Sequence, residues 1–103
     1  MRSLNFIAVG QNLQKDPNCD FTGIVKGSKG YLQAHFSFDD EWSGCGKVAV
    51  FTRLGKEYPV KLSADTCTIP EEALQYSRFN VHVIGVRDGF RIQTNDLKIE
   101  QEG

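Results

Sequence analysis

Residues 79–93 read FNVHVIGVRDGFRIQ, and this stretch decides the fold. Phe79, Val81 and Val83 occupy every second position with polar residues between them, which is the period of a β-strand with one buried face. Asp88-Gly89 then favours a tight hairpin turn, because glycine accepts a positive φ at little cost. Apolar and polar residues alternate again in the four positions that follow. The stretch therefore predicts two antiparallel strands, and it sets the period to look for in the rest of the chain.

The same period of two recurs in residues 4–9, 32–38 and 58–62, and turn-forming residues separate these runs. The run Val48–Phe51 is apolar at every position, so it could be covered on both sides. Only residues 69–74, in which a proline precedes two glutamates, indicate a helical turn. We predict an all-β fold: a two-sheet antiparallel sandwich of seven or eight strands with one short helical turn, in a single domain spanning residues 1–103.

Alternate strand positions supply the layer between two packed sheets. The predicted core consists of apolar residues in that register: Phe36, Phe38, Ala49, Phe51, Val60, Leu62, Phe79, Val81 and Val83. The same register leaves Val48 and Val50 on the other side of their strand.

The composition excludes several classes of partner. The chain has 12 basic and 13 acidic residues, and its formal net charge is −1. A nucleic-acid-binding domain usually carries a basic excess on one face, and an anionic membrane attracts a basic cluster. We therefore expect neither a nucleic-acid partner nor a membrane partner.

Location is indicated by two further features. The first residues contain no signal-peptide hydrophobic region, so we expect the protein to be made in the cytoplasm of the cell that produces it. Cys19, Cys45 and Cys67 are odd in number and have no CxxC spacing, which argues against a disulfide framework and favours a reducing compartment.

The residue types that carry catalysis are sparse. The two histidines, His35 and His82, occupy polar positions of separate strands and lack the close ligand spacing of a zinc site. A Cys–His pair formed by folding stays open at this point. The acidic run Asp39-Asp40-Glu41 could be half of a calcium site or a glycosidase-like carboxylate pair, but we interpret it as a solvated strand end. We expect no catalytic, cofactor-binding or metal-binding residues, and a protein that is not an enzyme.

A longer pattern begins at Tyr31: YLQAHFSFDDEWSGCGKVAVFTRLGKEYPVKL, then TCTIPEEAL, then FNVHVIGVRDGFRIQTNDLKI. Its order of aromatic-rich strand, Trp, Lys-x-Ala-x-Phe, Tyr-x-Val-x-Leu, Cys-x-Ile-Pro and Phe-x-Val-x-Val-x-Gly resembles the small immunoglobulin-like β-sandwich domains of tailed-bacteriophage virion proteins. Those domains occur in head fibres, in capsid decoration proteins and at the N-termini of baseplate proteins. The resemblance spans residues 31–99 and implies a non-enzymatic structural protein of the virion that docks on a capsid or baseplate protein. A homo-oligomer is also consistent with this role.

Two sets of residues follow as candidates for function. If the protein works by protein–protein contact, apolar residues in the outward register should mark the contact: Ile84, Val86, Ile7 and Val9. The alternative for these four is that they lie under a loop or a neighbouring strand. The alternative function is a carbohydrate-binding module that contacts host cell-surface glycans, with aromatic stacking platforms at Trp42, Tyr31 and Tyr76. For Trp42 itself we favour a packing role in the core or at its rim over a platform.

Overall fold

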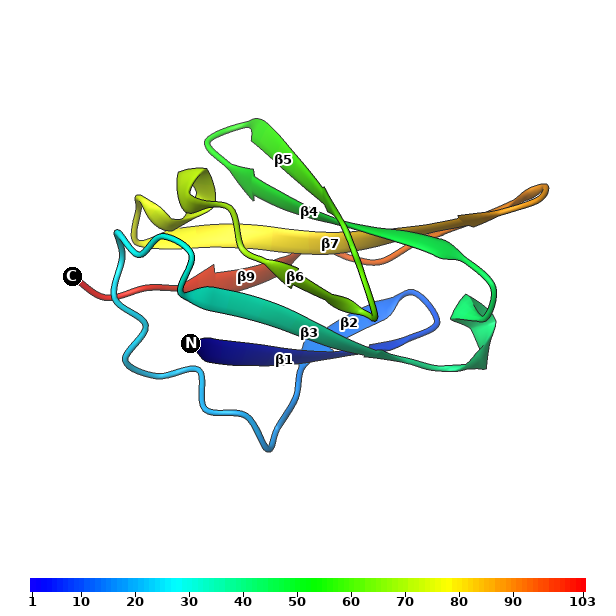
Figure 1. Ribbon diagram of the computed structural model, residues 1–103, viewed down its shortest axis with the longest axis horizontal. Helices are drawn as coiled ribbons and strands as arrows, with labels where there is room; N and C mark the ends of the chain where they lie inside the picture. Colours follow the sequence, from blue (N-terminus) through cyan, green and yellow to red (C-terminus); the bar gives the residue numbers. More distant parts are fainter.

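The computed structural model describes residues 1–103 and contains nine strands and two short 3-10 helices in two facing sheets (Figure 1). The elements in chain order are β1 (Arg2–Val9), β2 (Asn12–Lys15), β3 (Leu32–Phe38), η1 (Asp40–Trp42), β4 (Gly46–Arg53), β5 (Lys56–Lys61), β6 (Thr66–Thr68), η2 (Glu71–Leu74), β7 (Arg78–Arg87), β8 (Phe90–Gln93) and β9 (Leu97–Glu100). The all-β class and the sandwich-like arrangement are confirmed. The helical turn expected at residues 69–74 is present as η2.

Sheet topology corrects the prediction in one respect. The four-stranded sheet has the order β2-β1-β3-β6, and the five-stranded sheet has the order β5-β4-β7-β8 with β9 also paired to β7. All pairs are antiparallel except β1 and β3, which run parallel, so the four-stranded sheet is mixed. The reason is that residues 16–31 carry the chain back to the starting end of β1 before β3 begins. The predicted strand count was also too low, because β6 has only three residues and is too short for a periodic pattern to be recognised.

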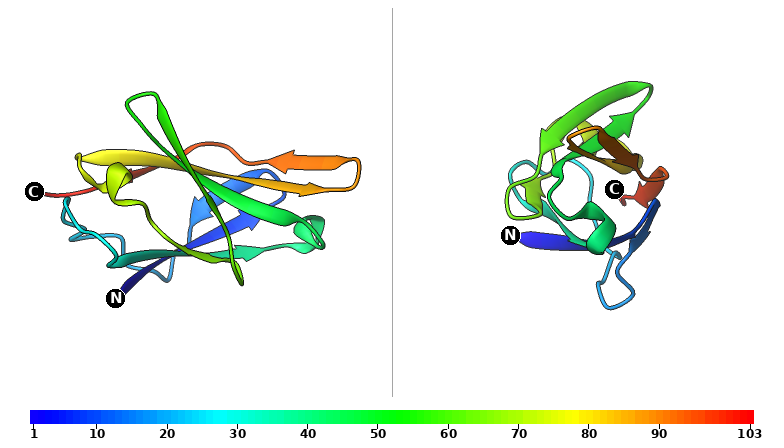
Figure 2. Two further views of the ribbon diagram at one scale, coloured as in Figure 1. Left: turned by 45° about the horizontal axis from the view of Figure 1, so that its top comes forward. Right: turned by 90° about the vertical axis from the view of Figure 1, so that its right-hand side faces the viewer.

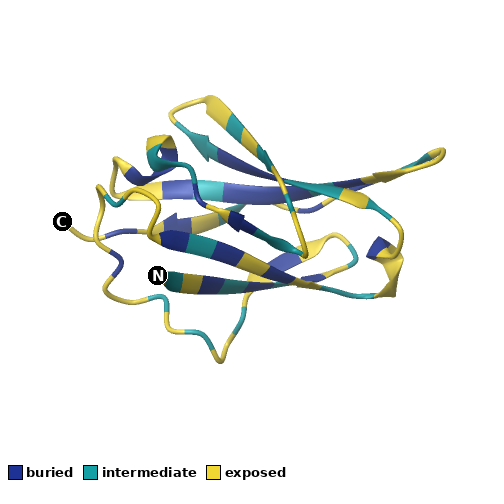
Figure 3. Cartoon of the chain, viewed as in Figure 1, coloured by how far each residue is buried: buried dark blue, intermediate teal, exposed yellow.

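The core lies between the two sheets, and buried residues alternate with exposed ones along β1, β3 and β7 (Figure 3). Six of the nine predicted core residues are buried: Phe36, Ala49, Phe51, Phe79, Val81 and Val83. The other three, Phe38, Val60 and Leu62, are only partly buried. Val60 lies on the edge strand β5, and the edge strand of the other sheet, β6, is too short to cover it fully.

Trp42 is the largest fully buried side chain, and it belongs to η1. Its Nε1 donates a hydrogen bond to the Gly10 carbonyl oxygen at 2.9 Å, and its ring packs 4.9 Å from that of Phe38. A Cβ on Gly85 would lie 2.7 Å from the indole, so only glycine fits there. In the end-on view of Figure 2, η1 lies in front of the space between the sheets. The indole therefore fills one end of the core.

The acidic run at residues 39–41 directly follows the end of β3, and Asp40 and Glu41 are exposed, so the interpretation as a solvated strand end is confirmed for these two residues. Asp39 is half-buried and has a structural role. Asp39 stands at the N-terminal boundary of η1, and its Oδ2 accepts a hydrogen bond from the Gly10 N–H at 3.1 Å. The next two acidic residues form the first turn of η1, where the positive end of the backbone dipoles favours them. The run turns the chain so that Trp42 enters the core.

The side chain of Asn95, which lies between β8 and β9, links the five-stranded sheet to β2 of the other sheet. Its Oδ1 accepts a hydrogen bond from the Leu13 N–H at 2.7 Å, and its Nδ2 donates to the Leu13 carbonyl oxygen at 3.3 Å. The preceding Thr94 accepts the Val83 N–H at 2.9 Å through Oγ1. These side chains replace backbone partners at the break, so β2 and the five-stranded sheet stay connected.

The β4–β5 hairpin turns through Leu54 and Gly55, which both have positive φ values, +50° and +78°. Two consecutive residues of this kind fit a type I′ turn, for which Asn-Gly is preferred. Leucine in this conformation costs about 1–2 kcal/mol, and Leu54 recovers little of it by packing because its side chain is 76% exposed.

We expect Leu54→Asn to raise the free energy of unfolding by about 1 kcal/mol, because asparagine tolerates the left-handed region. Urea denaturation followed by far-UV circular dichroism measures the change. Gly55→Ala is the matched control and should lower stability. A Leu54→Asn protein less stable than the parent would contradict the account of this turn.

Candidate functional site

The outer face of the five-stranded sheet carries a row of apolar side chains. Along β7, Phe79, Val81 and Val83 face the core, so Ile84 and Val86 point away from it. The pairing of β4 with β7 places Val48 beside Ile84 and Val50 beside His82. We call Val48, Val50, Ile84 and Val86 the apolar strip.

Only part of the apolar strip is accessible at the surface. Val86 is 53% exposed, so the alternative that it lies under a loop or strand is wrong. Ile84 is half-buried, and it lines an open hollow of about 500 Å³ on this outer face. Val50 is only 5% exposed and forms part of the floor of the same hollow.

Polar and charged residues surround this floor: Glu57, His82, Arg91, Gln93, Thr94 and Asp96. His82 Nδ1 lies 2.9 Å from Asp96 Oδ1, which fixes the imidazole against the sheet. Arg91 donates to the side-chain oxygen of Gln93 at 3.1 Å. An apolar centre within a polar rim of both charge signs is the usual anatomy of a protein–protein interface.

The other two candidate contact residues, Ile7 and Val9, lie on the opposite side of the molecule. They point outward from β1 in the four-stranded sheet, because Leu4, Phe6 and Ala8 of that strand face the core. Ile7 is half-buried, and Val9 is 53% exposed. The four predicted residues therefore form two separate surfaces, one on each outer face.

The outer face of the four-stranded sheet is polar and almost free of charge. Its outward residues on β1, β3 and β6 include Ser3, Asn5, Gln33, His35, Ser37, Thr66 and Thr68. Ile7 lies among them and has Gln14 and Ser37 as its register partners. The outer face of the five-stranded sheet therefore carries four neighbouring apolar residues, whereas Ile7 has only polar register partners.

The predicted glycan platform is wrong at Trp42, because a fully buried indole has no face free for a sugar. Tyr31 and Tyr76 are 48% and 46% exposed. One face of the Tyr76 ring is occupied by the guanidinium of Arg53, whose central carbon lies 3.3 Å from the ring centroid. The carbohydrate-binding alternative therefore depends on two tyrosines and stays a prediction.

The titratable side chains do not converge. His35 faces outward beside Thr66, whereas Cys67 on the next position of β6 faces the core, so these two do not form a Cys–His pair. Burial raises the pKa of the Cys67 thiol to about 12, which keeps it protonated at neutral pH. No group of three or more His, Cys, Asp or Glu side chains is placed to hold a metal ion.

The protein is a two-sheet β domain, and one of its outer faces carries an apolar strip that is exposed at Val86. Comparison with known proteins found no matching family model, no similar curated protein and no similar solved structure. The structure has no helix of the length and apolarity needed to cross a lipid bilayer.

Sequence reasoning missed two features of these surfaces. Val48 and Val50 were assigned to the side away from the core, but their position next to Ile84 and His82 depends on the pairing of β4 with β7. The stacking of Arg53 on Tyr76 was also missed, since the two residues are far apart in the chain. The sequence around Arg53, a charged residue next to a turn, does not indicate that its side chain stacks on the Tyr76 ring.

Proposed function

We propose that this protein is an accessory structural component of a tailed-bacteriophage virion, and that it acts by binding another protein of the particle. The apolar strip is the contact surface in this proposal, and no reaction is catalysed there. The proposal includes an immunoglobulin-like type of sandwich, from whose antiparallel arrangement the mixed four-stranded sheet departs.

The single observation that carries the proposal is the apolar strip at the centre of the five-stranded sheet, in which Val86 is exposed and Val48 and Ile84 are half-buried. Val50 and Ile84 lie at the bottom of a hollow of about 500 Å³ with Glu57, Arg91 and Asp96 at its rim. Burying an apolar centre within a charged rim gives both affinity and orientation when a protein partner docks. A flat sheet face that served only to close the fold would favour polar outward side chains instead.

The class of partner comes from the residue pattern over positions 31–99, which resembles virion domains. Several of its members have structural roles in this fold. Trp42 fills one end of the core, Phe51 and Phe79 pack 6.1 Å apart between the sheets, and Pro70 precedes η2. A partner among capsid or baseplate proteins follows from that resemblance, and an additional homo-oligomer is compatible with it.

Ile84→Asp should weaken binding to particles at least tenfold and leave the fold intact, because it places a charge at the centre of the apolar strip. Co-sedimentation with capsids or tails of the phage that encodes the chain measures the binding. Ile7→Asp is the matched control: a half-buried isoleucine in a central strand, but on the opposite outer face.

Unchanged co-sedimentation of a folded Ile84→Asp protein would remove the apolar strip from the proposal. Equal loss with Ile7→Asp would show that the effect is general and not confined to this face. Sedimentation velocity on the free protein distinguishes a further outcome: a dimer that Ile84→Asp dissociates would mean that the strip is covered by a second copy of the chain.

A further inference from the structure

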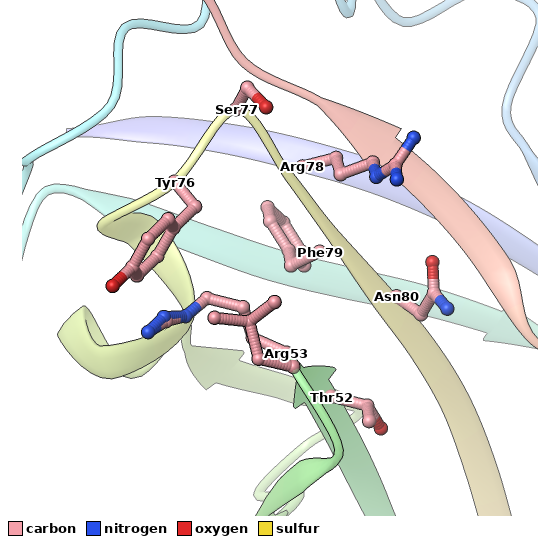
Figure 4. A pocket seen from close by; sticks show the side chains of 8 residues that line it. Thr52, Arg53, Tyr76, Ser77, Arg78, Phe79 and Asn80 are labelled. Atoms are coloured by element: carbon pink, nitrogen blue, oxygen red, sulfur yellow. The ribbon is translucent and has the colours of Figure 1, made fainter.

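A second hollow, of about 270 Å³, lies at the end of the five-stranded sheet where β4 ends and β7 begins (Figure 4). The eight residues that line it are Thr52, Arg53, Leu54, Tyr76, Ser77, Arg78, Phe79 and Asn80. Two of them are arginines and none is acidic. Neither arginine takes part in any of the four ion pairs of the structure. Arg78 has Glu100 as its register partner on β9, so Arg53 is the arginine of the hollow that has no acidic residue opposite it.

Arg53 is held in a fixed position within this hollow. Its guanidinium lies against the ring of Tyr76, with a distance of 3.3 Å from the central carbon to the ring centroid, and Arg78 lies on the other side of Phe79 (Figure 4). The Nε and Nη1 atoms of Arg53 are sealed from solvent and have no hydrogen-bond partner. Nη2 is then the nitrogen through which Arg53 can bind an external acceptor. A partly desolvated guanidinium with no counter-ion gains strongly from an anionic acceptor.

The backbone that carries the Tyr76 ring is anchored by the C-terminal residues. The Tyr76 carbonyl oxygen accepts a hydrogen bond from Gln101 Nε2 at 2.7 Å, and the Ser77 carbonyl oxygen accepts one from the Gln101 N–H at 2.6 Å. Gln101 is only 7% exposed. Because ring and guanidinium are both positioned before any ligand arrives, little conformational entropy is lost on binding.

Leu54 gives the hollow an apolar wall next to the cation. Its side chain is 76% exposed, and its backbone adopts a positive φ that leucine disfavours. Nothing within the molecule compensates for this combination. Strain of this kind is retained where a residue contributes to function, and an exposed leucine contributes by packing against an apolar group of a ligand.

We propose that this hollow binds an acidic segment of a partner protein, in which a carboxylate pairs with Arg53 and a neighbouring apolar side chain packs on Leu54. The proposal rests on the proposed function, since it supplies a second contact for a protein that works by binding proteins. A carboxylate of a polypeptide fits better than a free or polymer-bound phosphate, because only the polypeptide also uses the leucine. Tyrosine and arginine are in addition the residue types most enriched at the energetic centres of protein interfaces.

The test is an NMR titration of the ¹⁵N-labelled full chain with two octapeptides, one of repeating Leu-Glu and one of repeating Leu-Gln. We expect the acidic peptide to bind at least tenfold more tightly and to shift the Arg53 Nε–Hε and Leu54 amide signals. Arg53→Gln should abolish this preference, and Leu54→Asn should weaken binding of both peptides. Arg87→Gln is the matched control, because Arg87 also stacks on an aromatic ring, that of Phe90 at 4.1 Å, but lies outside the hollow.

Equal affinity for the two peptides would overturn the proposal, as would the same loss with Arg87→Gln as with Arg53→Gln. Tighter binding of inorganic polyphosphate than of the acidic peptide would replace the carboxylate by phosphate and overturn it as well. If Arg53→Gln does not fold, the NMR titration of the parent protein tests the proposal alone. Peptide-induced shifts confined to signals outside residues 52–54 and 76–80 would place the peptide elsewhere and overturn it. Ile84→Asp separates the two proposals: it should lose particle binding and retain the acidic peptide.

Discussion

Replacing Trp42 by alanine should lower the free energy of unfolding by about 3–5 kcal/mol from loss of the buried ring, and by about 1 kcal/mol more because the Gly10 carbonyl loses its hydrogen bond. The side chain is fully buried and fills one end of the core. Gly85 has no side chain to occupy the space that the indole leaves. The free energy of unfolding of a native protein is about 5–15 kcal/mol in total, so the variant should be only marginally folded.

Urea unfolding followed by far-UV circular dichroism measures this loss, because the variant has no tryptophan for fluorescence. Trp42→Phe is the control: it keeps an aromatic ring but has no N–H for Gly10, and it should cost about 1–2 kcal/mol. A loss below about 1 kcal/mol for Trp42→Ala would mean that the ring is accessible, as a glycan platform requires. The same measurement thus tests the fold and one of the functions predicted for this residue.

The hairpin of residues 79–93 shows what periodicity can predict. Its two strands and the turn at Asp88-Gly89 depend on neighbouring residues, and the structure has them as β7 and β8. Periodicity does not predict the direction of β3 relative to β1. A parallel and an antiparallel neighbour require the same alternation of apolar residues, so the pattern of residues 32–38 predicts a strand and leaves its partner open.

The position of Trp42 could have been inferred from a glycine. Gly85 follows Phe79, Val81 and Val83 in the inward register of β7, so the absence of a side chain there leaves space for a large ring. Sequence reasoning favoured Trp42 as a packing residue of the core or its rim over a glycan platform, and its full burial confirms the packing interpretation. The acidic residues before Trp42 gave no information on which end of the core the indole fills, whereas the missing Cβ of Gly85 does.

The candidate site was predictable only in part for a related reason. Ile84 and Val86 point outward by simple alternation, and the structure places them on an open face. Their neighbours Val48 and Val50 are more than thirty positions away in the sequence and join them through strand pairing. Predicting a surface that is made of two strands requires the strand order as well as the register. The strand order depends on contacts between residues that are distant in the chain.

Phe36→Ala is expected to cost about 3–5 kcal/mol, because the ring is central to the interior layer. Phe36 is 1% exposed, and its ring stacks on Phe6 of the parallel neighbour β1 with 5.1 Å between centroids. An aromatic pair of this kind contributes about 0.5–1.5 kcal/mol beyond the area that it buries. The loss should therefore exceed that of an equally buried aliphatic residue in the same sheet.

Ser37→Ala on the same strand should change stability by less than about 0.5 kcal/mol, because its side chain points to solvent from the outer face. Thermal and urea unfolding of the two variants, measured side by side, give the comparison. A shift of one residue in the pairing of β3 would exchange the two faces of the strand. A larger loss with Ser37→Ala than with Phe36→Ala would then mean that the register is inverted, and that the apolar residues assigned to the two outer faces must be assigned again.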